Sequence, residues 1–229
     1  MENTARTVRA IVFDLDDTLY PEVEYVRSGY RVVAAALAGE KLDQDQIYDL
    51  LWQEFERGDR RRVFNSILRQ MDREDSPEEV TRLIEIYRQH RPELTLDREV
   101  RELLETLKSQ FKLGLVTDGF LPAQKLKVQA LDLELFFDSI CYTEELGREY
   151  WKPATKAFER MSRALQCEPQ QCVYVADNPA KDFIAPNQLG WRSIQLQCDW
   201  QIQKDKTAPP EGQAQATVQR LNTLLEIVL

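Results

Sequence analysis

The chain has 229 residues, a formal net charge of −9 and a sequence pI of about 4.9. Nucleic-acid-binding proteins are usually basic, so we expect no nucleic-acid polymer as a partner. No apolar run approaches the roughly 20 residues that cross a bilayer, so we expect no membrane partner either. The first ten residues, MENTARTVRA, contain no apolar signal-peptide segment, and we predict a cytoplasmic protein.

The cysteines and the single histidine narrow the possible chemistry. None of the four cysteines forms a CxxC pair, which favours small buried thiols over a zinc site. His90 is the only histidine in the sequence, so we expect neither a histidine-rich metal centre nor a Ser-His-Asp triad. We expect His90 on the surface or at the end of a helix.

The first part of the chain reads as one strand followed by helices. Ala10–Phe13 is continuously apolar and β-branched, which is typical of a strand buried on both faces. Residues 21–92 carry apolar side chains at helical spacing in four successive stretches. Gly39 and Gly58 are expected helix ends, and Ser76 before a proline is an expected N-cap. This region predicts a small helical bundle inserted into the rest of the fold.

After Pro92 strands alternate with helices. Further strands are predicted at 113–116, 139–142, 172–175 and 193–196, and helices at about 97–109, 122–131, 153–166, around Pro186 and at 214–228, with a loop at 199–212. Such alternation predicts an α/β fold, a Rossmann-like parallel sheet with helices on both faces. The predicted domains are a core domain, 1–20 and 93–229, and a helical domain, 21–92.

Acidic or hydroxyl-bearing residues follow three of the five predicted strands: Asp14 and Asp16, Thr117 and Asp118, and Asp177, with Asp182 five residues further on. The carboxyl ends of parallel strands meet at one edge, where ligands of such sheets bind. Carboxylates this close raise one another's pKa unless a cation offsets their charge, and a hard divalent ion such as Mg²⁺ prefers these oxygens. Asp17, by contrast, is expected to be a turn or helix-cap residue.

Four motifs in chain order resemble those of the haloacid dehalogenase (HAD) superfamily, and the resemblance covers essentially the whole chain. Asp14-Leu-Asp-Asp-Thr-Leu19 is similar to the signature Asp-x-Asp-x-Thr/Val. The other matches are Thr117 as the strand-end Ser or Thr, Lys152 before a proline, and Asp177 with Asp182 as the final acidic motif. Ala176 departs from the glycine that often precedes the metal-binding aspartate.

This resemblance implies a role for each matched residue. Asp14 would attack phosphorus and form an aspartyl-phosphate, while Asp16 would act as general acid and base. Asp14, Asp177 and the backbone carbonyl of Asp16 would hold Mg²⁺, and Asp182 would support Lys152 or a metal-bound water. Phosphate would be bound by Lys152, Thr117 and backbone N–H groups near Asp118 and Gly119.

The resemblance also implies that the helical domain is an α-helical cap over a small phosphorylated substrate. The predicted function is a Mg²⁺-dependent phosphatase for a sugar phosphate or nucleotide. A 2-haloacid dehalogenase, a phosphomutase and a catalytically inactive binding module stay open as alternatives, as do the substrate and the oligomeric state. Candidate cap contacts, each with a structural or solvent-facing alternative, are Tyr20, Tyr25, Arg27, Arg60 and Arg61.

Overall fold

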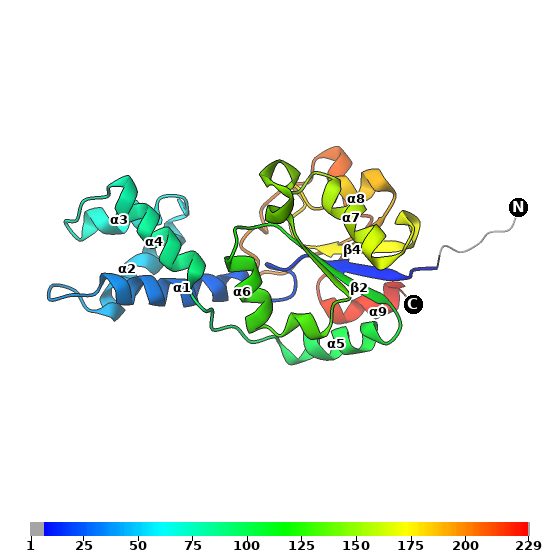
Figure 1. Ribbon diagram of the computed structural model, residues 1–229, viewed down its shortest axis with the longest axis horizontal. Coiled ribbons are helices and arrows are strands. Elements are labelled where there is room, and N and C mark those ends of the chain that lie inside the picture. The colour runs from blue at the N-terminus through cyan, green and yellow to red at the C-terminus, as the bar shows by residue number, and fades with distance from the viewer. Residues whose placement is uncertain (1–6, 229) are drawn as a thin grey trace, which may run out of the picture. The chain divides into compact units, whose positions relative to one another are not determined.

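The computed structural model describes residues 7–228, which fall into two compact units (Figure 1). The core unit contains the described residues up to Glu22, Thr95–Phe120 and those from Leu131 onward. The helical unit contains Val23–Leu94 and Leu121–Ala130. The predicted boundaries placed 121–130 in the core domain, whereas this segment lies with the helical unit. Residues 1–6 and 229 of the predicted core domain lie outside the described part.

A six-stranded parallel sheet forms the centre of the core unit, in the order β3-β2-β1-β4-β5-β6. Its strands are β1 (Ala10–Phe13), β2 (Lys112–Thr117), β3 (Ser139–Tyr142), β4 (Cys172–Ala176), β5 (Arg192–Leu196) and β6 (Ala216–Val218). All four residues of β1 are buried, as the apolar run predicted. Phe13 is in register with Leu115 of β2 and Val175 of β4, so the three strands end side by side.

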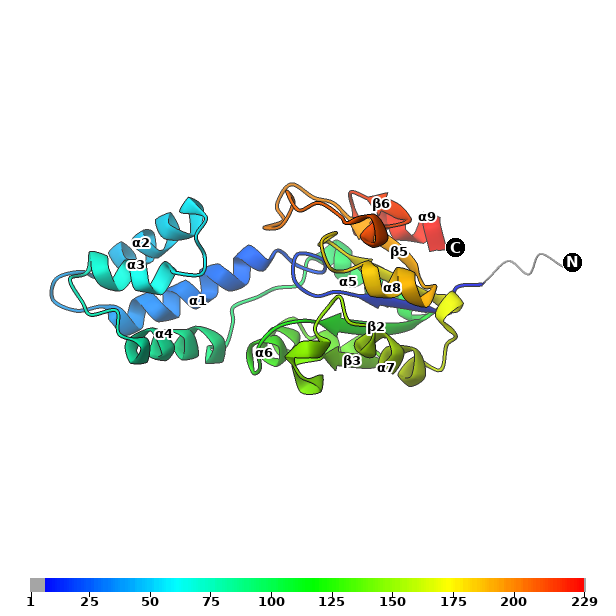
Figure 2. The same cartoon turned by 90° about the horizontal axis from the view of Figure 1, so that it is seen from above.

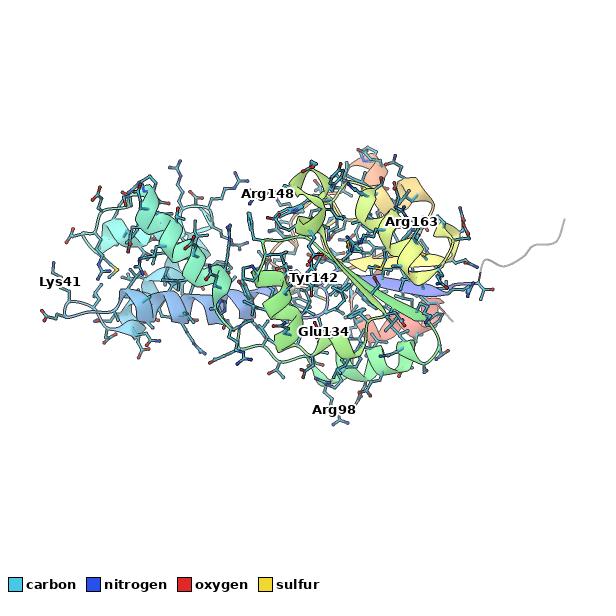
Figure 3. All side chains as sticks on the ribbon, in the orientation of Figure 1. Lys41, Arg98, Glu134, Tyr142, Arg148 and Arg163 are labelled. Atoms are coloured by element: carbon cyan, nitrogen blue, oxygen red, sulfur yellow. The ribbon has the colours of Figure 1, made fainter. Side chains whose placement is uncertain are left out.

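Helices cover both faces of this sheet, which confirms the predicted fold class. Figure 1 shows α7 (Lys156–Leu165) and α8 (Ile184–Leu189) on one face, and α5 (Arg98–Lys108) and α9 (Leu224–Val228) on the other. Buried aromatic side chains fill the space beneath α7 and α8, among them Phe158, Tyr174 and Trp191. On the outer sides of α5 and α7, Arg98 and Arg163 point into solvent (Figure 3). These helices are therefore amphipathic and hold the sheet from both sides.

The helical unit contains five helices, of which α1 to α4 lie together in Figure 2. They are α1 (Glu22–Leu37, whose first residue belongs to the core unit), α2 (Gln44–Arg57), α3 (Val63–Gln70), α4 (Pro77–Gln89) and α6 (Ala123–Ala130). Gly58 ends α2 with a left-handed φ of 96°, and the Ser76 side chain accepts a hydrogen bond from the backbone of Glu79 at the start of α4. Both predicted helix boundaries are confirmed.

His90 lies at the C-terminal end of α4, as one of its two predicted placements required, and the surface alternative is wrong. The imidazole is only 6% exposed. Its Nδ1 lies 2.6 Å from the Tyr87 carbonyl oxygen and its Nε2 lies 3.1 Å from Ser28 Oγ. Burial lowers the pKa of His90, so the ring is a neutral structural group. Three of the four free cysteines are buried, as predicted, and Cys198 is half-buried.

The predicted helix over 214–228 is wrong in its first half. Leu221, Leu224 and Val228 are buried at helical spacing, which produced the prediction. Residues Ala216–Val218 instead form β6, and the backbone N–H of Gln197 donates to the Val218 carbonyl at 2.9 Å. Edge pairing with β5 outweighs local helical preference here, so the sheet has six strands rather than five. In the described residues no helix has the length and apolarity to cross a membrane.

Candidate active site

A buried lysine links two carboxylates at the carboxyl end of the sheet. Asp14 follows β1 and is fixed there by its backbone N–H, which donates to the Val175 carbonyl at 2.9 Å. Lys152 Nζ lies 2.7 Å from Asp14 Oδ1 and 2.7 Å from Asp182 Oδ1. It also donates to the Tyr174 hydroxyl at 3.0 Å, and the Lys152 side chain is 0% exposed. Burial lowers the pKa of Lys152, but Asp14 and Asp182 outweigh it, so the ammonium stays charged.

Three carboxylates converge beside this ammonium. Asp14, Asp177 and Asp182 each offer one oxygen, and these oxygens lie within 4.8 Å of one another. Burial raises the pKa of Asp14 to about 7 although Lys152 opposes the shift. Burial, followed by repulsion from Asp182 and Asp14, raises the pKa of Asp177 to about 9. One lysine is therefore not enough for all three carboxylates to ionise at neutral pH, and their oxygen donors fit a hard divalent cation that would favour the ionised forms.

The Asp16 carboxylate is not one of these three converging groups and instead contacts Tyr20. Its Oδ1 accepts a hydrogen bond from the Tyr20 hydroxyl at 2.5 Å. The predicted contribution of Asp16 to a metal site was its backbone carbonyl, so this side-chain contact leaves that prediction open. Asp17 has a left-handed φ of 54°, and its Oδ1 accepts from the backbone N–H of Glu22 at 2.8 Å. Asp17 is thus the turn and helix-start residue that the sequence indicated.

The loop after β2 contains the predicted phosphate-binding residues. Thr117 is 1% exposed, and its hydroxyl lies 3.4 Å from the Asp118 carbonyl oxygen. Gly119 has φ 144°, a conformation that side-chain-bearing residues rarely adopt. Asp118 and Gly119 thus follow β2, the neighbour of β1 in the sheet, and Asp118 lines the same pocket as Asp14.

The carboxylate of Asp118 forms contacts with several loops. The sequence did not indicate this structural role. It accepts hydrogen bonds from Thr143 Oγ1 at 2.9 Å and from the backbone N–H of Lys152 at 3.2 Å. It also pairs with Lys181 Nζ at 2.8 Å. Burial raises the pKa of Asp118, but Lys152 and Lys181 outweigh it and hold the pKa below its usual value. The loops after β2, β3 and β4 are therefore tied to one ionised group.

A pocket of about 200 Å³ opens onto these groups within the core unit. Its lining consists of Asp14, Asp16, Asp17, Glu22, Asp118, Asp177, Asn178, Lys181 and Gln203. The other predicted site residues, Thr117, Gly119, Lys152 and Asp182, are not in this lining. Lys152 is in contact with both Asp14 and Asp182. Sequence reasoning missed Glu22, Asn178, Lys181 and Gln203 as pocket residues. Lys181 had one available signal, its place directly before Asp182.

The haloacid dehalogenase-like hydrolase family model matches residues 11–196, a span that runs from β1 to the end of β5 and includes all four motifs. The chain belongs to this family. The chain is similar to the glyceraldehyde 3-phosphate phosphatase of Methanopyrus kandleri, with 28% identity over 82% of this chain and 84% of the relative's own length. The ribulose-1,5-bisphosphate 5-phosphatase of Halopiger xanaduensis is 26% identical over 96% of this chain and 98% of its own length.

Solved structures share the HAD-like fold over nearly the whole chain. The HAD-hydrolase YfnB of Bacillus subtilis, solved bound to magnesium, superposes with a TM-score of 0.71 at 21% identity, over 97% of this chain and 99% of its own. The 2-haloacid dehalogenase of Pseudomonas syringae superposes with a TM-score of 0.65 at 22% identity, over 97% and 98%. At these identities the likeness establishes the fold, because one fold supports several chemistries.

Proposed function

We propose that the protein is a Mg²⁺-dependent phosphatase that hydrolyses a small phosphomonoester through an aspartyl-phosphate on Asp14. The observation that carries this proposal is the buried ammonium of Lys152, 2.7 Å from both Asp14 and Asp182, beside a polar pocket. Relatives named glyceraldehyde 3-phosphate phosphatase support a small sugar phosphate as the substrate.

In the first step, a carboxylate oxygen of Asp14 attacks phosphorus as the ester P–O bond breaks. The departing oxygen takes a proton from Asp16, which is two residues along the same loop. In the second step, a water attacks phosphorus, gives its proton to Asp16 and breaks the bond to Asp14, which releases inorganic phosphate. Lys152 keeps Asp14 oriented in both steps and offsets the charge that gathers around phosphorus.

The metal would be held by Asp14 and Asp177, with the Asp16 carbonyl as the further ligand that the family resemblance implies. When bound, Mg²⁺ supplies positive charge that shields the anionic phosphoryl group from the anionic nucleophile. Asp177 is well placed for this role, since its side chain already accepts a hydrogen bond from Thr18 Oγ1 at 3.4 Å and its backbone carbonyl accepts one from Gln195 at 3.3 Å.

Thr117 and the backbone around Asp118 and Gly119 would bind the phosphoryl oxygens, and Asp182 would hold Lys152 in place. The helical unit, residues Val23–Leu94 with Leu121–Ala130, would serve as the cap that excludes water and selects the leaving group. This assignment refines the predicted cap of 21–92 by adding α6.

A 2-haloacid dehalogenase is the main alternative within the fold. Such enzymes release halide rather than an alkoxide, and a general acid at the position of Asp16 has no proton to deliver in that step. The presence of Asp16, held at 2.5 Å by Tyr20, favours the phosphatase.

The decisive experiment measures phosphate release from a panel of sugar phosphates, nucleotides and an aryl phosphate, with and without Mg²⁺, for the wild type and Asp14→Asn. We expect Mg²⁺-dependent release that falls at least about a thousandfold in the variant, which keeps the shape of the side chain but removes the nucleophile. Circular dichroism of the variant checks that the fold is retained. Substantial turnover by well-folded Asp14→Asn would overturn the covalent mechanism.

A further inference from the structure

The pocket beside Asp14 is polar on every side. All nine lining residues carry polar or charged side chains, and six of them are acidic. Five of the nine have no part in the proposed phosphoryl chemistry; Asp17 and Lys181 are held by contacts within the protein, and Glu22, Asn178 and Gln203 are the other three. A substrate whose phosphoryl group lies at Asp14 would meet polar side chains in the rest of this pocket, which can form hydrogen bonds to it rather than apolar contacts.

Gln203 reaches this pocket because its loop is anchored on either side of Asp17. The loop between β5 and β6 passes the site at residues Gln201–Gln203. Gln201 is 5% exposed, and its amide donates to the backbone carbonyls of Asp17 at 2.9 Å and Leu196 at 3.1 Å. The backbone N–H of Ile202 donates to Asp17 Oδ2 at 2.6 Å. The next residue, Gln203, is held at the pocket by these bonds.

The same aspartate fixes Glu22. One oxygen of Asp17 accepts from the backbone of Ile202, and the other accepts from the backbone of Glu22 at 2.8 Å. The Asp17 side chain therefore anchors the segments that contain Glu22 and Ile202, which lie about 180 residues apart in sequence. Since Asp17 directly follows Asp16, both pocket residues keep a fixed distance from the proposed acid and base.

The negative charge of the pocket restricts which leaving groups it can accept. Lys181 is the one basic residue in the lining, and it is paired with Asp118 at 2.8 Å. Glu22, Asp16 and Asp17 are acidic groups of the same lining. A second phosphate or a carboxylate on the substrate would be repelled there, whereas hydroxyl groups would find donors and acceptors.

We propose that Gln203 is a specificity-determining residue that contacts hydroxyl groups of the leaving group, and that Glu22 rejects a second anion. The preferred substrate class is a phosphomonoester with a neutral, hydroxylated leaving group rather than a bisphosphate or a phosphorylated acid. This inference rests on the proposed phosphatase function and refines it.

The first test compares glycerol phosphate with p-nitrophenyl phosphate, which has no hydroxyl group to bind. Gln203→Leu removes the amide at similar size, and Lys204→Met alters the next residue, which is exposed and outside the pocket lining. We expect Gln203→Leu to lower kcat/KM for glycerol phosphate about tenfold more than for the aryl ester, mainly through KM. Lys204→Met should change neither. An equal loss on both esters, or no loss, would overturn the role of Gln203.

The second test compares glycerol phosphate with phosphoglycerate, which differs by one carboxylate. The wild type should prefer the neutral ester, and Glu22→Gln should reduce that preference at least about threefold. Glu211→Gln, an exposed change of equal charge outside the pocket lining, should leave the preference as it is. A wild type that favours phosphoglycerate, or an unchanged preference in Glu22→Gln, would overturn the charge argument. If the wild type releases phosphate from no ester with Mg²⁺, the proposed function itself fails.

Discussion

The Tyr20 hydroxyl donates a hydrogen bond to Asp16 Oδ1 at 2.5 Å, and Tyr20 is itself 2% exposed. This contact fixes the orientation of the carboxylate that is proposed to protonate the leaving oxygen. This contact favours the structural alternative that the sequence analysis left open for Tyr20, and we propose that Tyr20 positions Asp16.

Tyr20→Phe should slow hydrolysis of an alkyl phosphate at least about tenfold, because a hydrogen bond to a charged group contributes roughly 1.5–3 kcal/mol. An aryl phosphate with a good leaving group needs little protonation and should be slowed much less. The measurement is kcat for a series of esters of graded leaving-group pKa. A uniform loss across that series would assign Tyr20 a purely structural role.

Lys152→Met should destabilise the metal-free protein by about 3–5 kcal/mol, because it leaves the carboxylates of Asp14 and Asp182 buried without their cation. Turnover should fall at least about a hundredfold as well. Urea unfolding gives the first number, and Lys206→Met, an exposed change of the same type, is its control. An unfolding free energy equal to that of the wild type would contradict the ion-pair account.

Stabilisation by Mg²⁺ should grow with pH between about 6 and 9. Folding raises the pKa of Asp14 from 3.8 to about 7 and that of Asp177 from 3.8 to about 9. The folded metal-free protein therefore holds protons that the unfolded chain has lost. The associated stability is fully present below pH 3.8 and is lost as the pH rises through about 7 and about 9. Mg²⁺ binds the ionised carboxylates and offsets the loss.

The measurement for this prediction is Tm with Mg²⁺ minus Tm with a chelator, taken across the pH range. Asp177→Asn provides the control, since an amide cannot ionise and its metal-free Tm should fall less steeply with pH. A difference in Tm that shrinks toward pH 9 would show that the carboxylate cluster does not bind the ion.

Gly114→Ala should destabilise the core unit by about 1–3 kcal/mol through overpacking between β2 and α7. A Cβ at Gly114 would lie 2.7 Å from Met161 Sδ and 3.1 Å from Val12 Cγ2. Gly39→Ala is a matched control, because its Cβ would meet no atom within 4 Å. Urea unfolding of both variants tests the difference, and similar free energies for the two would contradict the predicted overpacking.

The sequence predicted well what depends on local pattern. A continuously apolar strand such as β1 and a cap such as Ser76 each carry their signal within a few residues. β6 was missed because a three-residue edge strand has almost no local pattern and forms only by pairing with β5.

The same distinction between local pattern and long-range contact applies to the candidate site. Motif order selected Asp14, Lys152 and Asp177, which the fold brings together at the carboxyl end of the sheet, and their catalytic roles stay predictions. The pairing of Lys181 with Asp118 spans 63 residues, and the bond from Ile202 to Asp17 spans 185. None of these residue types is unusual in a loop, so no pattern along the chain could have revealed the two contacts. Gln203 was missed for the same reason, because the contacts of its neighbours hold it at the pocket.

The central place of β1 in the sheet governs when the site around Asp14, the proposed nucleophile, can form during synthesis on the ribosome. β1 pairs with β2 and β4, whose residues emerge about 100 and 160 positions later. Until Cys172–Ala176 has left the exit tunnel, Asp14 has neither its neighbouring strand nor the carboxylates that follow it. Such distant pairing is slow and leaves apolar β1 exposed in the nascent chain. A growing polypeptide is therefore catalytically silent through most of translation, and β1 is the segment for which a chaperone would have most to shield.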